Sequence, residues 1–147
     1  QGGIDLLAFS LDAAQPLHAG DRLTLHLYWR AVQPDLPDYQ AEIELLSGED
    51  ESVTAWPMVQ RRHPAGIPTS RWTWWPLLKT YVRDSYHLRL PRELPAGTYR
   101  IAVRLETCSL ASIAPCATGT PLFVYDGRGT SLGTQAVLPV TLRVLAD

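Results

Sequence analysis

Three tryptophans gather in one short stretch, and they are the residues of this chain best suited to chemistry at a surface. Trp72, Trp74 and Trp75 lie within four residues of one another. An indole ring stacks on the face of a sugar, and it also anchors interfaces because it joins a large apolar area to a polar N–H. The stretch therefore predicts a sugar platform, an interface with protein or membrane, or a set of rings that closes the open end of the fold.

Charged and aromatic neighbours extend this candidate site. Arg61 and Arg62 precede the tryptophans. Guanidinium groups bind carboxylate or phosphate in a forked geometry, including the phosphates of lipid-linked sugars. The alternative is a solvated loop that is rich in arginine. The predicted ligand-binding residues are Trp72, Trp74, Trp75, Arg71 and Tyr81.

Two cysteines, Cys108 and Cys116, flank a short loop. Their spacing suits a disulfide at the end of a hairpin, and such a bond would indicate an oxidising compartment. Two free thiols in a cytosolic loop are the alternative. A zinc site is not expected, because two cysteines without a nearby histidine pair do not complete a tetrahedral site.

The acidic residues and histidines form no recognisable catalytic pattern. Glu49, Asp50 and Glu51 are neighbours in a polar turn, whereas a glycosidase needs two carboxylates that face each other across a cleft. His26 and His87 fall on outward faces of predicted strands, where we expect exposed neighbouring histidines and no metal site. The sequence also lacks a nucleophile elbow, a zinc-protease motif and a phosphate-binding glycine loop. We expect no catalytic residue, metal or cofactor in this chain.

The elements that must position these residues are β-strands. In the segment from Asp21 to Ala31, apolar residues occupy every odd position from 23 onward, and the side chains between them are mostly polar. This period of two predicts one buried face and one wet face, and a helix would need a different spacing. Further predicted strands run from Ile4 to Leu11, Tyr39 to Leu46, Ser52 to Val59, Asp84 to Leu90, Thr98 to Glu106 and Gln135 to Ala146.

The predicted fold class is all-β, a two-sheet antiparallel β-sandwich of seven to nine strands, either immunoglobulin-like or jelly-roll-like. Pro57 restricts its strand to an edge or a short length, and Pro139 places the last strand near an edge or at a bulge. The segment from Gln60 to Lys79 is a long irregular connection, and loops of this length are usually functional or cover something.

Length and composition are those of one globular domain. The chain has 147 residues, 46% of them hydrophobic, and a net charge of −2, which does not favour nucleic acid as a partner. No apolar run is long enough to cross a bilayer. Because the chain begins with Gln1 and not with methionine, we expect a fragment of a larger protein, and any membrane anchor would lie outside it.

Three segments in order resemble a known family. They run from Gly20 to Ala31, from His63 to Trp72 and from Val82 to Arg100. In the family, a strand ending in Tyr-Trp is followed by a Pro-Gly-Pro-Thr-x-x-Trp segment, an Asp-x-Tyr strand and a Pro-x-Gly-x-Tyr hairpin. This pattern resembles the C-terminal extracytoplasmic β-sandwich domains of bacterial membrane glycosyltransferases, in the protein-mannosyltransferase-like class. Asp84 matches the pattern, and we expect it to be a buried carboxylate that holds a loop.

The resemblance implies a non-catalytic accessory module of a membrane-anchored, glycosyltransferase-like protein, located in the periplasm or at the cell surface of a bacterium. Its expected partners are glycan, lipid-linked sugar or the rest of its own polypeptide. The alternative is a structural or protein-interaction domain that docks through the loop from Trp72 to Trp75. The insertion after Trp72 and the loop between the cysteines depart from the family pattern, so functions tied to them would be particular to this protein.

Overall fold

The structure is a computed structural model that describes residues 3–47, 54–57, 62–72, 81–108 and 119–146. Within these residues the chain forms eight β-strands and two short 3₁₀ helices, and no helix there is long and apolar enough to span a membrane. The elements are β1 (Ile4–Ala13), β2 (Leu17–His18), β3 (Arg22–Ala31), β4 (Tyr39–Ser47), β5 (Thr54–Pro57), η1 (Pro64–Gly66), η2 (Thr69–Arg71), β6 (Val82–Arg89), β7 (Gly97–Thr107) and β8 (Ala136–Leu145).

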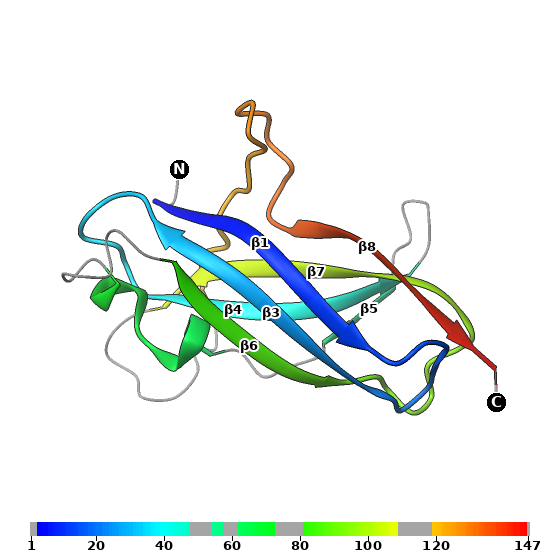
Figure 1. The fold of residues 1–147 in the computed structure, drawn as a ribbon. Coiled ribbons are helices and arrows are strands. Elements are labelled where there is room, and N and C mark those ends of the chain that lie inside the picture. Colours follow the sequence, from blue (N-terminus) through cyan, green and yellow to red (C-terminus); the bar gives the residue numbers. More distant parts are fainter. Residues whose placement is uncertain (1–2, 48–53, 58–61, 73–80, 109–118, 147) are drawn as a thin grey trace.

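The strands form two sheets that face each other. Sheet A has three strands in the order β1-β3-β6, and sheet B has five strands in the order β2-β8-β7-β4-β5. Sheet A lies in front of sheet B in Figure 1. All strand pairs are antiparallel except the two-residue pairing of β2 with β8. The predicted two-sheet β-sandwich is therefore confirmed.

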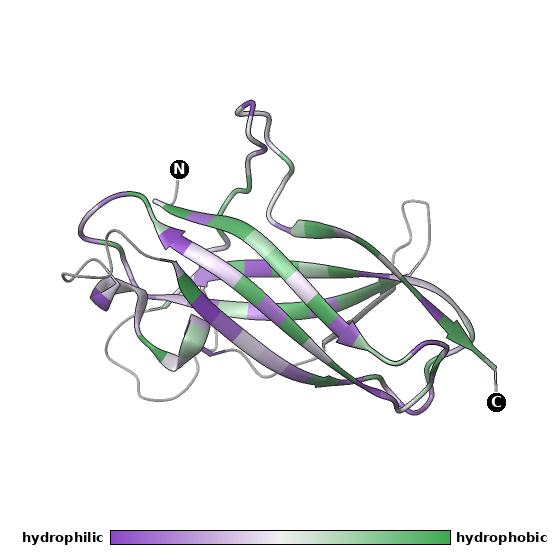
Figure 2. Ribbon diagram, in the orientation of Figure 1, coloured by the Kyte–Doolittle hydropathy of each residue, from purple (hydrophilic) through white to green (hydrophobic). Residues whose placement is uncertain are grey.

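The core lies between the sheets, and it is built from the alternation that the sequence shows. Leu25 and Leu27 of β3 are fully buried, as are Ile43 and Leu45 of β4. The same alternation is visible as bands of contrasting hydropathy along the strands in Figure 2. Burying each such leucine or isoleucine side chain contributes roughly 1.5–3 kcal/mol to folding.

Both strand prolines lie where the sequence predicts. Pro57 belongs to β5, the edge strand of sheet B. Pro139 lies at an irregularity in the pairing of β7 with β8, where Arg100 pairs with Thr141 but Ala102 pairs with Val137. Three residues of β8 thus stand opposite one residue of β7, so the strand accommodates Pro139 in a bulge where its missing N–H costs no ladder bond.

The turn before β7 is fixed by a tyrosine. The hydroxyl of Tyr99, which is itself 3% exposed, donates a hydrogen bond to the carbonyl of Pro95 at 2.6 Å. A tyrosine that bonds back to the backbone a few residues upstream is the tyrosine corner of Greek-key sandwiches. The Pro-x-Gly-x-Tyr hairpin noted in the sequence is thus a device that holds the entry to β7.

A hairpin between β7 and β8 extends away from the sandwich (Figure 1). Val124 donates its N–H to the carbonyl of Gly133, and Leu132 donates to that of Val124. At the tip, the Oδ1 atom of Asp126 accepts the N–H groups of Arg128 and Thr130, both at 2.8 Å. We call this element the 122–133 hairpin.

Candidate functional site

The structure corrects the prediction that Trp72 binds ligand. Its side chain is 0% exposed and belongs to the hydrophobic core between the sheets. A ring without accessible surface cannot stack on a sugar or a partner. Of the three interpretations drawn from the sequence, burial of Trp72 agrees with the one in which the rings cover the open end of the sandwich. Trp74 and Trp75 lie outside the described residues, so their roles stay predictions.

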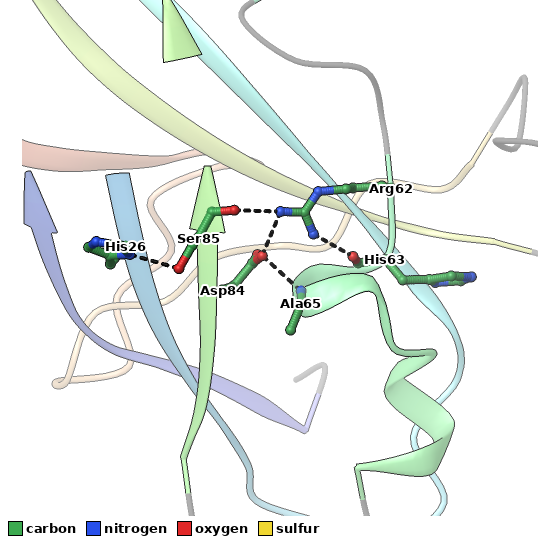
Figure 3. Close-up of polar contacts among 6 residues, drawn as sticks. All are labelled: His26, Arg62, His63, Ala65, Asp84 and Ser85. Atoms are coloured by element: carbon green, nitrogen blue, oxygen red, sulfur yellow. Dashed lines mark hydrogen bonds and ion pairs between the residues drawn. The ribbon is translucent and has the colours of Figure 1, made fainter. Parts of the chain in front are cut away.

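Asp84 anchors the loop that carries Trp72, as predicted. This carboxylate is 0% exposed, and its Oδ1 atom accepts a bond from the Arg62 guanidinium at 2.9 Å and from the Ala65 N–H at 2.8 Å. Arg62 also donates to the carbonyls of Ser85 and His63, as Figure 3 shows. These bonds join the loop to β6, so Arg62 has a structural role and is not a solvated loop arginine.

Arg62 also lies 4.2 Å above the ring of Tyr86. Tyr86 is 2% exposed, and its hydroxyl interacts with the Asp84 carboxylate but makes no hydrogen bond of regular geometry among the described residues. Burial, assisted by the negative charge of Asp84, raises the pKa of Tyr86 far above its ordinary value, and the positive charge of Arg62 opposes this shift. The neutral phenol therefore persists in the folded state at every physiological pH.

A second anchor holds the other half of the same loop. Thr69 is fully buried, and its hydroxyl accepts the N–H of Tyr39 and donates to the carbonyl of Pro37. The carboxylate of Asp38 accepts the N–H of Ser70 at 3.0 Å. Because the loop is anchored both by Asp84 and by Thr69 with Asp38, the side chain of Trp72 is held in the hydrophobic core.

The remaining described residues of the predicted site are exposed. Arg71 lies on η2 at the surface. Tyr81 is 63% exposed, and its ring meets that of Tyr28 edge to face, with centroids 5.7 Å apart and an angle of 71°. No described contact joins Arg71 to Tyr81. Tyr81 instead belongs to the outer face of sheet A, which sequence reasoning did not single out as a site.

The outer face of sheet A is a polar, nearly continuous surface over β3 and β6. The register places Tyr28 opposite Arg83, His26 opposite Ser85, and Thr24 opposite His87. His26 and His87 are therefore diagonal neighbours, as the alternation of the two strands predicts. The residues of this face are Arg22, Thr24, His26, Tyr28, Tyr81, Arg83, Ser85, His87 and Arg89.

Hydrogen bonds fix the middle of this face. The His26 Nδ1 atom lies 2.8 Å from the Ser85 hydroxyl, a contact drawn in Figure 3. One terminal nitrogen of Arg83 lies 3.3 Å from Nδ1 and 3.2 Å from Nε2 of the same imidazole. Because an in-plane hydrogen bond reaches only one ring nitrogen, these similar distances place the guanidinium over the face of the ring. Beside it, Arg62, Gly66 and Arg83 border a shallow hollow of about 410 Å³.

The cations of this face are not neutralised. No carboxylate among the described residues forms an ion pair with Arg22, Arg83 or Arg89. Arg89 donates only through Nε, to the carbonyl of Gly20. A signal for this face exists in the sequence, since Tyr28 and the arginines occupy the polar positions of strands, but alternation alone does not separate a binding face from a solvated one.

A second candidate surface is an apolar groove between β1 and the 122–133 hairpin. Its volume is about 800 Å³. Four of its lining residues, Leu7, Val32, Phe123 and Tyr125, are between 43% and 63% exposed. β1 pairs only with β3 in the described structure, so its other edge borders the groove unpaired. Exposed apolar surface of this kind marks interaction sites. We call it the β1 groove.

The remaining predictions meet the structure only in part. Within the described residues no group of three acidic, histidine or cysteine side chains is arranged to hold a metal ion, and Glu49, Asp50 and Glu51 lie outside those residues. The described residues include no free cysteine, and Gln40 donates to the sulfur of Cys108 at 2.6 Å. Cys116 lies outside the described residues, so the disulfide stays a prediction.

The chain matches no protein-family model and no curated protein sequence.

Proposed function

We propose that this chain is a non-catalytic, extracytoplasmic accessory module of a membrane-anchored, glycosyltransferase-like protein, and that it binds glycan or lipid-linked sugar on the outer face of sheet A. The resemblance of its sequence pattern to such modules supports the first half of this proposal. The second half places the binding site on sheet A, because Trp72 is buried in the core and the exposed described aromatic of the predicted site, Tyr81, lies on that face.

The observation that carries the proposal is the aromatic pair of Tyr28 and Tyr81. Tyr81 offers a ring that is 63% exposed, and its edge-to-face contact with Tyr28 holds that ring in place. The hydroxyls and ring nitrogens of Ser85 and His26 lie on the same face. A fixed aromatic surface beside hydrogen-bonding groups meets both requirements of sugar binding: apolar stacking and polar recognition of hydroxyls.

The test is isothermal titration calorimetry of the purified domain with a panel of soluble oligosaccharides. We expect saturable binding to at least one sugar, and a loss of about tenfold or more in affinity for Tyr81→Ala, equivalent to an aromatic contact of roughly 1.4 kcal/mol. Tyr125→Ala is the matched control, since Tyr125 is also an exposed tyrosine but lies on the 122–133 hairpin. Equal losses in both variants, or no binding to any sugar, would contradict the proposal.

A second function, protein docking, is favoured by the β1 groove. Four of its lining side chains are large, apolar and exposed, and the unpaired edge of β1 offers backbone hydrogen bonds to an added strand. The occupant that fits is an extended apolar segment from the rest of the parent polypeptide. The groove is a docking face in addition to the one predicted for the loop from Trp72 to Trp75, where Trp72 is buried and Trp74 and Trp75 lie outside the described residues.

Docking is tested by mixing the purified domain with the separately produced remainder of its parent protein. We expect association that Phe123→Ser abolishes and Tyr81→Ala preserves, measured by analytical ultracentrifugation. Association that survives Phe123→Ser but is lost in Tyr81→Ala would assign docking to sheet A and remove the role of the groove.

A further inference from the structure

We infer that the glycan bound by the outer face of sheet A carries an acidic group, a carboxylate or a phosphate, and that Arg83 receives that group. The inference rests on the proposed function, and it adds the chemical class of the ligand. Three observations support it. Arg83 is held in place without an ion pair among the described residues, Tyr81 lies on the same face of sheet A, and that face carries an excess of positive charge.

Arg83 is an exposed cation that the fold holds in place without neutralising it. Its guanidinium lies 3.2 Å and 3.3 Å from the two ring nitrogens of His26, and His26 is fixed in turn by Ser85. None of the described ion pairs includes Arg83. A positioned guanidinium binds anions at a smaller entropic cost than a mobile one, and its fork matches the two oxygens of a carboxylate or phosphate.

Arg62, in contrast, is a neighbouring arginine whose charge is neutralised within the fold. It lies beside the same shallow hollow, but its donors bind the Asp84 carboxylate and the carbonyls of His63 and Ser85. Those donors are occupied by the fold. Arg83, two residues from the exposed ring of Tyr81, contacts His26 through one terminal nitrogen and forms no ion pair among the described residues, so its charge is available to a ligand.

The distance between Arg83 and Tyr81 suits a single acidic sugar unit. Alternate residues of a strand project from the same face about 7 Å apart. A pyranose ring stacked on Tyr81 would therefore direct an exocyclic acidic substituent toward Arg83. The edge-to-face contact between Tyr28 and Tyr81 keeps the ring and the cation on one face.

The rest of the face carries more basic than acidic side chains. Arg22 and Arg89 extend the cationic surface along β3 and β6. Arg30, at the other end of β3, is neutralised by Asp5 at 2.7 Å. The neighbouring strand β1 contributes Asp12 as a further acidic residue opposite Thr24. The face thus keeps a positive excess although the whole chain has a net charge of −2, and such a surface attracts anions from solution.

The experiment compares matched acidic and neutral sugars by calorimetry at low ionic strength. The probes are oligogalacturonate against its methyl ester, which distinguishes a carboxylate source, and mannose 6-phosphate against mannose, which distinguishes a phosphate source. We expect on the order of tenfold tighter binding of one acidic member, and loss of that preference in Arg83→Gln with the affinity for the neutral member unchanged. Arg128→Gln, an exposed arginine on the 122–133 hairpin, is the matched control and should keep the preference.

The outcomes separate this inference from the proposed function. Equal binding of the acidic and neutral members overturns the inference and leaves glycan binding intact. Absence of binding to every sugar overturns both. Binding to phosphatidylglycerol vesicles that is tighter than binding to either acidic sugar, and that is lost in Arg83→Gln, would assign the face to an anionic membrane surface and also overturn the inference.

Discussion

The outer faces of the two sheets carry the same kinds of side chain and use them in opposite ways. On sheet A, Arg83 is exposed and has no carboxylate partner among the described residues. On sheet B, Arg104 lies between three glutamates of β4 and β7, at 3.9 Å from Glu42, 3.6 Å from Glu44 and 3.8 Å from Glu106. The glutamate side chains there are only 9–12% exposed.

Burial determines which charged face of this β-sandwich is free to bind a ligand. Charges that are largely removed from water must be paired, so the glutamates of sheet B and their arginine serve the fold. Gln135, which precedes β8, completes the cluster by donating to Glu44 at 2.7 Å. Charges that stay in water and unpaired cost the fold little, and they remain available to a ligand. This contrast supports the proposal that sheet A binds a ligand, whereas the paired charges of sheet B stabilise the fold.

The largest effect that we predict separates the buried aromatic of the loop from the exposed aromatic of sheet A. Trp72→Ala should lower the free energy of unfolding by about 4 kcal/mol, because it empties a fully buried site. Tyr81→Ala should change it by no more than about 0.5 kcal/mol. Urea denaturation followed by circular dichroism measures both. A Trp72→Ala variant as stable as Tyr81→Ala would mean that the ring does not close the sandwich.

A slightly smaller effect should distinguish the two ion pairs that involve sheet A. Asp84→Ala leaves Arg62 and the Ala65 N–H without their buried acceptor, and we expect a loss of about 3 kcal/mol in the free energy of unfolding. Asp5→Ala removes an exposed pair with Arg30, whose side chains are 44% and 49% exposed, and should cost less than about 1 kcal/mol. Comparable losses in thermal unfolding would show that Asp84 is not the anchor of the loop.

Alternation along the strands predicted most of the fold. Leu25 and Leu27 face the core, and Pro139 lies at a bulge, because both features follow from local rules of side-chain direction and backbone donors. Asp84 was predicted as a buried anchor through its place in the Asp-x-Tyr pattern, and its contacts confirm that role.

Burial that depends on distant parts of the chain was not predictable in the same way. Trp72 sits in a polar-looking loop, and its burial results from anchors at Asp38 and Asp84, which lie far from it in sequence. Glu44 has the alternation of an outward residue, yet it is 8% exposed because Gln135 approaches from the other end of the chain. Period-two patterns tell which face a residue is on, but not whether that face is covered.

The third prediction compares the two arginines directly. Arg104→Leu should lower the free energy of unfolding by about 2 kcal/mol, because it leaves three largely buried glutamates without their cation, an effect moderated by the 27% exposure of the Arg104 side chain. Arg83→Leu should stay within about 0.5 kcal/mol of the unmodified protein. Adding Glu44→Gln to Arg104→Leu should recover part of the loss in urea denaturation. A destabilised Arg83→Leu would indicate that Arg83 is structural as well.

The smallest effect concerns the inner side of sheet A and appears only in alkali. The pKa values of Tyr86 and Tyr99 are both raised by burial. As the pH rises above about 10, the unfolded chain releases these protons before the folded protein does. The stability that the two tyrosines contribute is therefore fully present below that pH and is lost above it, by about 1.4 kcal/mol per pH unit for Tyr86. Tyr86→Phe and Tyr99→Phe should each reduce this slope in denaturation series from pH 9 to 11.

At neutral pH the same two variants should differ. The Tyr99 hydroxyl donates to the carbonyl of Pro95 at 2.6 Å, whereas the Tyr86 hydroxyl makes no hydrogen bond of regular geometry among the described residues. Tyr99→Phe should therefore cost about 1 kcal/mol at pH 7, and Tyr86→Phe should be close to neutral. If Tyr86→Phe kept the full alkaline slope, the phenol beneath Arg62 would have to be ionising in the folded protein. The inner side of sheet A would then carry an ionisable charge, as its outer face does.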